Sequence, residues 1–116
     1  MKRVSFDKIS TTIANQTERS ISEYSPGMYI DCTDDGDWFI GNIIRVCEEF
    51  DDVYCKFLHR SNRIFTWPRN DDECWVPINH IVCVVKSLTA MSQRARSYTI
   101  SSHELDFITK NLSNIL

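Results

Sequence analysis

The segment from Trp38 to Cys47 is apolar on both of the faces that an extended strand presents. Successive side chains of a strand point to opposite faces, so Trp38 and Ile40 share one face, while Phe39 and Ile43 share the other. A strand with two apolar faces belongs in the middle of its sheet. In a short chain, such a sheet must curve to cover both faces. The segment therefore favours a small, strongly bent antiparallel sheet.

Gly41 lies inside this segment and predicts a bend or a close approach of another backbone. The Asp-Asp-Gly-Asp sequence before Trp38 predicts a tight turn, and Ile-Asn-His at 78–80 predicts a single helical turn. Further strands are predicted at residues 28–32, 53–58, 74–77 and 81–85. Their number and spacing favour a mainly β fold, a five- or six-stranded antiparallel barrel over residues 25–86.

Within the strand 53–58, alternation predicts that Val53, Cys55 and Phe57 face inward, and that Tyr54 and Lys56 face outward. Residues 59–73 form the longest irregular stretch. Because Phe65 and Trp67 would share a face of an extended segment, a short strand is expected inside it.

The two ends of the chain are predicted to differ. Ser-Ser-His-Glu at 101–104 is a capping-box pattern, and apolar residues follow at helical spacing: Leu105, Ile108, Leu112 and Ile115. An amphipathic helix is therefore expected over 102–115, its apolar stripe either packing on the barrel or serving a homodimer. Residues 1–24 are expected to form a polar N-terminal arm or a short helix, and residues 87–101 a connector that is flexible at its basic part, 93–96.

Composition narrows the classes of function. The chain has 116 residues and a formal charge of −3, which predicts one domain and disfavours a surface that binds polyanions throughout. The beginning of the chain lacks the apolar stretch of a secretory signal, and no apolar run approaches membrane-spanning length. We therefore expect a soluble, intracellular protein without membrane contact.

The five cysteines lie at 32, 47, 55, 74 and 83, without a C-x-x-C pair. Most lie in or beside apolar strand patterns, which predicts small buried hydrophobic residues in a reducing compartment. A zinc site that adds His59 or His80 is the less favoured interpretation, because structural zinc ligands usually come in closely spaced pairs. No metal or other cofactor is expected.

A ligand-binding groove is predicted where Trp38 meets the later Cys-Trp-Val-Pro-Ile-Asn-His sequence. Two indole rings and a proline would form an apolar platform with hydrogen-bonding groups at its rim, and aromatic anchors dominate the energetics of interfaces. The alternative is that one or both rings plug the end of the barrel. The predicted groove consists of Trp38, Trp75, Pro77, Asn79 and His80.

Two families share these sequence features. The stretch from Ser-Pro-Gly-Met-Tyr to Asp-Trp-Phe-Ile-Gly-Asn-Ile resembles the first two strands of a Tudor domain. Together with Trp-Val-Pro-Ile-Asn-His-Ile it is similar to the second half of a Src-homology-3 domain, in which an Asp-Trp strand and a Pro-x-Asn-Tyr turn line a peptide groove. His80 stands where that family has its groove tyrosine. Both resemblances imply a small curved barrel that binds a protein or peptide segment.

The block from Phe-Leu-His through Phe-Thr-Trp-Pro-Arg to Arg-Ser-Tyr-Thr-Ile-Ser also resembles a domain of uncharacterised animal proteins, often associated with transposable elements. That resemblance implies a nuclear or chromatin-related setting.

The Tudor resemblance implies a cage of aromatic rings for a methylated lysine, held by cation–π attraction. Phe39 matches one cage position, while Cys32 or Thr33 occupies the position on the first strand. The expected cage is Phe39, Phe65 and Trp67, with Asp37 as the acid.

A second candidate partner is nucleic acid. Basic residues alternate with aromatic ones in the stretch after residue 55, an arrangement that can hold a phosphate backbone while rings stack on bases. The predicted contacts are Lys56, Arg60, Arg63 and Arg69, with His59 beside them. Against this, Asp71, Asp72 and Glu73 follow at once and could pair with these cations.

Catalysis has little support, because the chain contains no nucleophile–base signature and no phosphate-binding glycine loop. The sequence therefore predicts a non-catalytic interaction module that binds a protein segment, including a methylated or basic tail, through an aromatic groove. The alternative is a nucleic-acid-binding domain of a transposon-derived protein.

Overall fold

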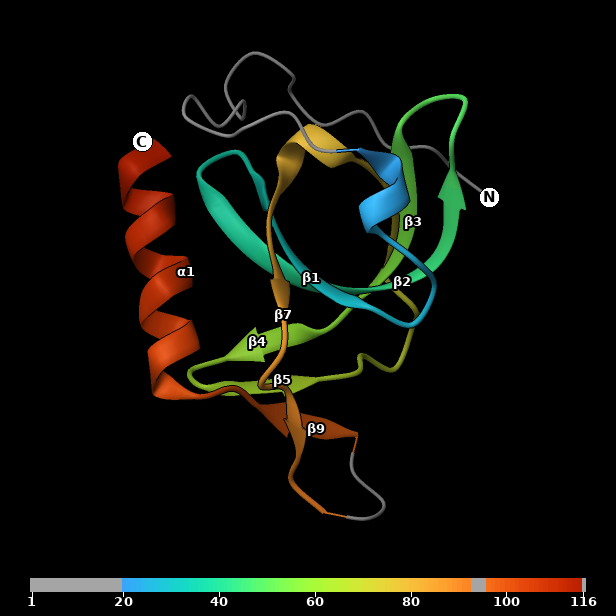
Figure 1. The fold of residues 1–116 in the computed structure, drawn as a ribbon. Helices are drawn as coiled ribbons and strands as arrows, with labels where there is room; N and C mark the ends of the chain where they lie inside the picture. Colours follow the sequence, from blue (N-terminus) through green and yellow to red (C-terminus); the bar gives the residue numbers. More distant parts are fainter. Residues whose placement is uncertain (1–19, 93–95, 116) are drawn as a thin grey trace.

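The computed structural model describes residues 20–92 and 96–115 of the chain, with side chains in the last helix as far as Asn111. These residues form two antiparallel sheets and a C-terminal helix (Figure 1). The predicted mainly β fold with a helix at its end is confirmed. The expected arm falls mostly outside the described residues, and its last part contains a short 3-10 helix, η1 (Ile21–Glu23).

The first sheet has five strands in the order β6-β3-β2-β1-β7. The strands are β1 (Tyr29–Asp34), β2 (Asp37–Cys47), β3 (Asp52–Phe57), β6 (Glu73–Pro77) and β7 (Ile81–Val85). The long strand β2 lies in the middle, as its two apolar faces predict. The sheet curves strongly, and the 3-10 turn η2 (Ile78–His80) joins its two edge strands (Figure 1). The hydrogen-bonded order leaves β6 and β7 as edges, so the sheet is not a closed barrel.

Local sequence explains the geometry around β2. Asp34 pairs with Asp37 across the turn between β1 and β2. The two central residues, Asp35 and Gly36, have φ of 53° and 80°. Two positive φ values define the hairpin turn that matches strand twist, which is why Asp-Gly occurs there. At Gly41, an added Cβ would lie 3.0 Å from a ring carbon of Phe57. The glycine is therefore closely approached, as predicted, but by side chains of β3 and not by another backbone.

The second sheet corrects two predictions. It contains four short strands in the order β4-β5-β9-β8: β4 (His59–Ser61), β5 (Ile64–Thr66), β8 (Thr89–Ala90) and β9 (Ser97–Thr99). The stretch 59–73, expected to be largely irregular, supplies the first two strands. The connector expected over 87–101 supplies the other two. The short strand expected around Phe65 is found as β5. Strands of two or three residues are otherwise too short to show a period of two, so the sequence pattern did not reveal the other three.

The described residues pack into two hydrophobic cores. The first lies inside the curve of the five-stranded sheet and includes Ile30, Ile43 and Val76. Val53, Cys55 and Phe57 also belong to it, as alternation along β3 predicts. The second core lies between the other face of that sheet, the second sheet and the helix α1 (Ser102–Ile115). It consists of Trp38, Ile40, Leu58, Phe65, Val85 and Ile108, with partly buried neighbours.

The helix α1 packs on the molecule through its apolar stripe. Ile108 is buried in the second core, and Leu105 packs against it. Packing was one of the two predicted roles of this stripe, and these two residues adopt it. Leu112 and Ile115 lie beyond the described side chains, so a homodimer through α1 stays a prediction.

The beginning of α1 is attached to the end of β7 by hydrogen bonds. The carboxylate of Glu104 accepts hydrogen bonds from the backbone N–H groups of Lys86 and Ser87 and from the Ser87 hydroxyl. The Ser101 hydroxyl accepts from the Glu104 N–H at 3.1 Å, as in a capping box. The reciprocal bond is different, because the Ser101 N–H donates to the Ser87 hydroxyl at 2.9 Å. Ser87 thus replaces Glu104 as the acceptor, and the cap connects two elements.

We expect Glu104→Gln to destabilise the protein by about 1–2 kcal/mol at pH 7, because a charge-assisted acceptor of several hydrogen bonds is lost. Partial burial raises the pKa of Glu104, but the hydrogen bonds from Ser87 and Lys86 outweigh it, and the pKa is lowered. The stabilisation is therefore complete above the pKa that Glu104 has in the unfolded state, and it disappears as pH falls through the lower pKa of the folded state. Urea unfolding of wild type and variant at pH 7 and pH 3 measures this. If wild type and variant differed equally in free energy of unfolding at both pH values, the role assigned to the Glu104 carboxylate would be contradicted.

Candidate binding site

A pocket of about 290 Å³ lies where the beginning of β2 meets the end of β3 and the strand β4. We call it the Trp38 pocket. Its lining includes Asp37, Trp38, Phe39, His59, Arg60 and Phe65. The fold brings these residues together because the N–H of Leu58 bonds to the carbonyl of Ile40 at 3.0 Å, which places the start of β4 beside the start of β2.

The guanidinium group of Arg60 occupies part of this site. Its central carbon lies 4.1 Å from the centroid of the Trp38 ring, a cation–π geometry. One of its nitrogens lies 3.2 Å from a carboxylate oxygen of Asp37. An aromatic face and a carboxylate thus hold one cation between them. This is an arrangement that can bind a cationic side chain.

The groove predicted from Trp38 and Trp75 is not formed. Trp38 pairs with Thr33 near the beginning of β2, whereas Trp75 pairs with Tyr54, which itself pairs with Arg45 further along β2. At about 3.3 Å per residue, Trp38 and Arg45 are roughly 20 Å apart along the strand. The two indole rings therefore cannot lie side by side.

The exposure expected for Trp38 is also wrong. Only 7% of this residue is exposed, and its ring centroid lies 5.9 Å from that of Phe65 in the second core. The second sheet and α1 cover the face of β2 that carries it. Trp75 is half-buried, with its ring 5.2 Å from that of Tyr54 and with Arg45 over it.

His80 does not form the rim of a groove. It is completely buried, and its Nδ1 lies 3.3 Å from the Thr33 carbonyl oxygen, to which it can donate. The imidazole therefore connects η2 to β1 inside the molecule. Of the other predicted groove residues, Asn79 is exposed and Pro77 is half-buried.

The predicted cage is found only in part. Asp37, Phe39 and Phe65 all line the Trp38 pocket, but Trp67 does not. Trp67 packs between Tyr29 and Tyr98, with centroid distances of 6.5 Å and 6.4 Å. Phe65 is 1% exposed, so it supports Trp38 from behind and offers little surface of its own. The indole of Trp38, which was assigned to the groove, takes the place expected for Trp67.

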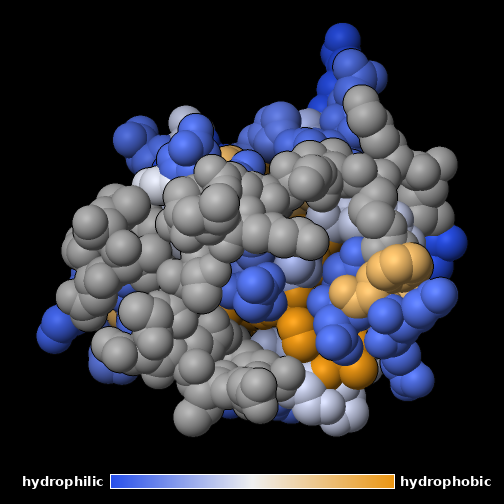
Figure 2. Space-filling view, turned by 90° about the horizontal axis from the view of Figure 1, so that it is seen from above, coloured by the Kyte–Doolittle hydropathy of each residue, from blue (hydrophilic) through white to orange (hydrophobic). Residues whose placement is uncertain are grey.

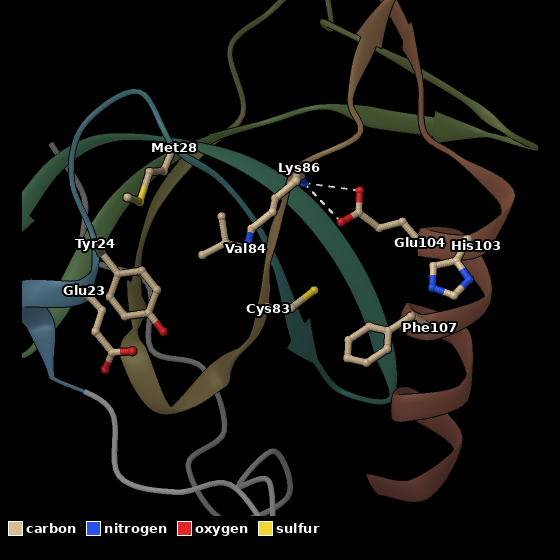
Figure 3. Close-up of a pocket in the computed structure, with 9 residues that line it drawn as sticks. All are labelled: Glu23, Tyr24, Met28, Cys83, Val84, Lys86, His103, Glu104 and Phe107. Atoms are coloured by element: carbon tan, nitrogen blue, oxygen red, sulfur yellow. Dashed lines mark hydrogen bonds between the residues drawn. The ribbon is translucent and has the colours of Figure 1, made fainter.

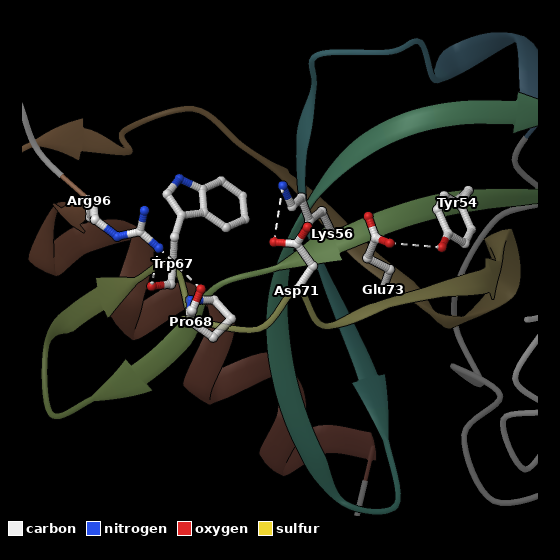
Figure 4. Close-up of polar contacts among 7 residues, drawn as sticks. All are labelled: Tyr54, Lys56, Trp67, Pro68, Asp71, Glu73 and Arg96. Atoms are coloured by element: carbon white, nitrogen blue, oxygen red, sulfur yellow. Dashed lines mark hydrogen bonds and ion pairs between the residues drawn. The ribbon is translucent and has the colours of Figure 1, made fainter. Parts of the chain in front are cut away.

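Acidic side chains neutralise much of the predicted nucleic-acid surface. Lys56 pairs with Asp71 at 3.2 Å and lies over the Trp67 ring (Figure 4). His59 lies 3.1 Å from Asp72, and Arg60 pairs with Asp37. Arg63 and Arg69 are exposed. The acids that follow this loop in the sequence thus pair with its cations, which weakens the case for a phosphate-binding surface.

A second, larger pocket of about 600 Å³ lies between η1, β7 and α1 (Figure 3). Tyr24, Met28, Val84 and Phe107 contribute apolar surface to it. The sequence patterns did not predict this pocket, although the apolar Phe107 beside the stripe of α1 was a signal. From above, most of the visible surface of the described residues is hydrophilic, and hydrophobic groups form a limited area (Figure 2).

The buried acid Asp31 has no hydrogen-bonding partner in the part of the chain that the structure describes. Asp31 of β1 is fully buried, and both of its carboxyl oxygens lack partners among the described residues. Burial raises the pKa of Asp31 to about 8, while the positive charge of Arg60 lowers it and Glu104 raises it. At neutral pH this carboxyl group is therefore held largely protonated.

The cysteines are free thiols, and three of them, Cys32, Cys55 and Cys74, are buried as predicted. Burial raises the pKa of each, so their thiolates are disfavoured. Within residues 20–92 and 96–115, no three His, Cys, Asp or Glu side chains gather as a metal site requires. No helix in the described part of the chain is long and apolar enough to cross a bilayer.

Comparisons of the chain with protein-family models, with curated proteins and with solved structures find no match. The resemblances to Tudor and Src-homology-3 domains therefore stay predictions.

Proposed function

We propose that this chain is a non-catalytic interaction module that binds a basic protein segment at the Trp38 pocket. The observation that carries this proposal is the stacking of the Arg60 guanidinium on Trp38, with Asp37 as its counter-ion. A site that already holds a cation through an aromatic face and a carboxylate has the chemistry to hold a cation from a partner.

The charge around the pocket supports a basic partner. The turn that leads into β2 carries Asp34, Asp35 and Asp37. A cluster of one sign attracts ligands of the opposite sign and raises their rate of association. The pairing of Lys56 and His59 with nearby acids leaves less positive charge for a phosphate backbone. A basic segment is therefore favoured over nucleic acid.

The architecture is compatible with the two family resemblances. A strongly curved antiparallel sheet, whose edge strands are joined by one 3-10 turn, is compatible with an open, barrel-like fold of the Tudor or Src-homology-3 kind. Domains of both families bind protein segments. The nuclear, chromatin-related setting follows from the resemblance to transposon-associated proteins and is part of this proposal. A methylated side chain is the finer alternative, because methyl groups strengthen contact with an indole face.

A non-catalytic role is proposed because the buried cysteines and His80 are poorly placed to act as nucleophile or base. Buried cysteines with raised pKa values are poor nucleophiles. His80 is enclosed in the interior, and its Nδ1 lies within hydrogen-bonding distance of a backbone carbonyl, which gives this histidine a structural role.

The proposal is tested by calorimetric titration of the protein with basic peptides that carry arginine, lysine or methylated lysine. Asp37→Asn should weaken binding about five- to tenfold, because the carboxylate partner of the cation is lost. Asp71→Asn is the matched control, since Asp71 pairs with Lys56 outside the pocket. If both variants bound the peptides with wild-type affinity, the assignment of binding to the Trp38 pocket would be contradicted.

A salt titration separates the two classes of partner. Binding of nucleic acid should weaken linearly with salt concentration on a log–log plot, with a slope set by the number of phosphates contacted. Tight binding of single-stranded nucleic acid with such a slope, together with no binding of basic peptides, would overturn the proposed function.

A further inference from the structure

We propose that Arg60 is a displaceable internal occupant of the Trp38 pocket, whose place is taken by an arginine side chain of the partner. The inference rests on the proposed function and deepens it, since it names the ligand chemistry and the group that competes with the ligand. The starting observation is that the pocket is partly filled by the chain's own guanidinium group.

Arg60 is held in a way that allows it to leave. It belongs to β4, an edge strand of the second sheet, and each of the three residues of β4 is exposed. Its side chain is 33% exposed, and that of Asp37 is 53% exposed. Contacts of this partly solvated kind are individually weak. The Arg60 side chain can therefore swing into solvent without disturbing β4, which pairs with β5 through its backbone.

The surface beneath Arg60 is fixed. Trp38 packs on Phe65, and its backbone pairs with Thr33 of β1. Asp37 accepts a hydrogen bond from the backbone N–H of Trp38 at 2.8 Å, which orients its carboxylate. Departure of Arg60 would thus expose a preformed indole face with an acid at its edge, and a preformed site saves the cost of ordering on binding.

The geometry favours guanidinium over other cations. A guanidinium group is planar, stacks flat on an indole and still presents N–H donors at its edge. Arg60 makes both contacts at once, to Trp38 and to Asp37. A quaternary ammonium has no N–H to donate, and it gains most from several exposed rings. Phe65 is too deeply buried to serve as a second ring. Phe39 is exposed, but it lies on the face of β2 opposite to Trp38, with its ring 6.3 Å from that of Phe57.

The test uses Arg60→Ala, with Arg63→Ala as the matched control from the same β4–β5 hairpin. The probe is capped arginine, N-acetyl-arginine amide, and capped lysine is the comparison. Binding is followed by the NMR signal of the Trp38 indole N–H. We expect Arg60→Ala to bind capped arginine about tenfold more tightly than wild type, equivalent to about 1.4 kcal/mol. Arg63→Ala should behave as wild type, and capped lysine should bind more weakly.

Equal affinity of Arg60→Ala and wild type, or no binding by either, would overturn the inference, because removing a competitor must strengthen binding. Circular dichroism checks that Arg60→Ala is folded. If it is not folded, Arg60→Lys serves instead. This variant should bind capped arginine a few fold more tightly than wild type, because lysine cannot stack flat on the Trp38 ring. The proposed function is judged separately, by binding of basic peptides to the wild type. If the wild type binds basic peptides but Arg60→Ala binds capped arginine no more tightly, the proposed function is retained and only the displacement of Arg60 is rejected.

Discussion

Asp31→Asn is expected to be more stable than the wild type at pH 7, on the order of 3 kcal/mol in free energy of unfolding. Asp31 is fully buried, and neither of its carboxyl oxygens has a hydrogen-bonding partner among the described residues. Folding at neutral pH therefore requires this group to take up a proton that it does not hold in the unfolded chain. Asparagine has a similar shape and carries no charge in either state, so the requirement disappears.

The pH dependence follows from the direction of the shift. The pKa of Asp31 is raised from 3.8 to about 8, so the folded protein binds more protons than the unfolded chain between these values. Stability should consequently fall as pH rises from about 4 to about 8, and this component should be missing in the variant. Urea unfolding at several pH values measures the difference between the two proteins, and the exposed Asp71→Asn is the control. Parallel curves for wild type and Asp31→Asn would contradict the assignment.

Trp38→Ala is expected to lower the free energy of unfolding by about 3–5 kcal/mol, as large-to-small changes in a core do. The ring of Trp38 packs on Phe65 and is covered by Arg60, and the residue is 7% exposed. Trp75→Ala should cost less, because Trp75 is only half-buried at the edge of the sheet. Chemical unfolding of both variants, followed by circular dichroism, measures the contrast.

Trp38→Phe is the control for this prediction, since it keeps an aromatic ring in the core and should lose less stability than the alanine variant. A loss below about 1 kcal/mol for Trp38→Ala, the size typical of a surface change, would mean that Trp38 is a surface ring after all.

The best sequence predictions came from patterns that depend on a few neighbouring residues. Asp35 and Gly36 provide the two positive φ values of a tight hairpin turn, and the alternation along β3 places Val53 in the first core. The helix after Ser101 begins with a capping pattern, and its backbone cap is found. Each of these features is decided by local sterics or by hydrogen bonds close in the sequence.

The candidate site was predicted less well, because it depends on contacts between distant residues. Asp37, Phe39 and Phe65 were correctly grouped, and they line one pocket. The pairing of Trp38 with Trp75 failed because alternation tells which face of a strand a residue occupies but not the register between strands, and the register separates the two residues by roughly 20 Å along β2. His80 was expected at a surface, yet a distant carbonyl on β1 lies within reach of its ring in the interior.

The sequence by itself determined the strands of the curved sheet, the turn at Asp35 and Gly36, and the helix at the end, since periodicity and backbone preferences act over short distances. Only the tertiary structure decided that the short strands β4, β5, β8 and β9 form a second sheet. Together with α1, that sheet covers Trp38 and places Arg60 over its ring. Such strands have weak preferences of their own and become stable by packing on the five-stranded sheet. The pocket is therefore a product of that packing.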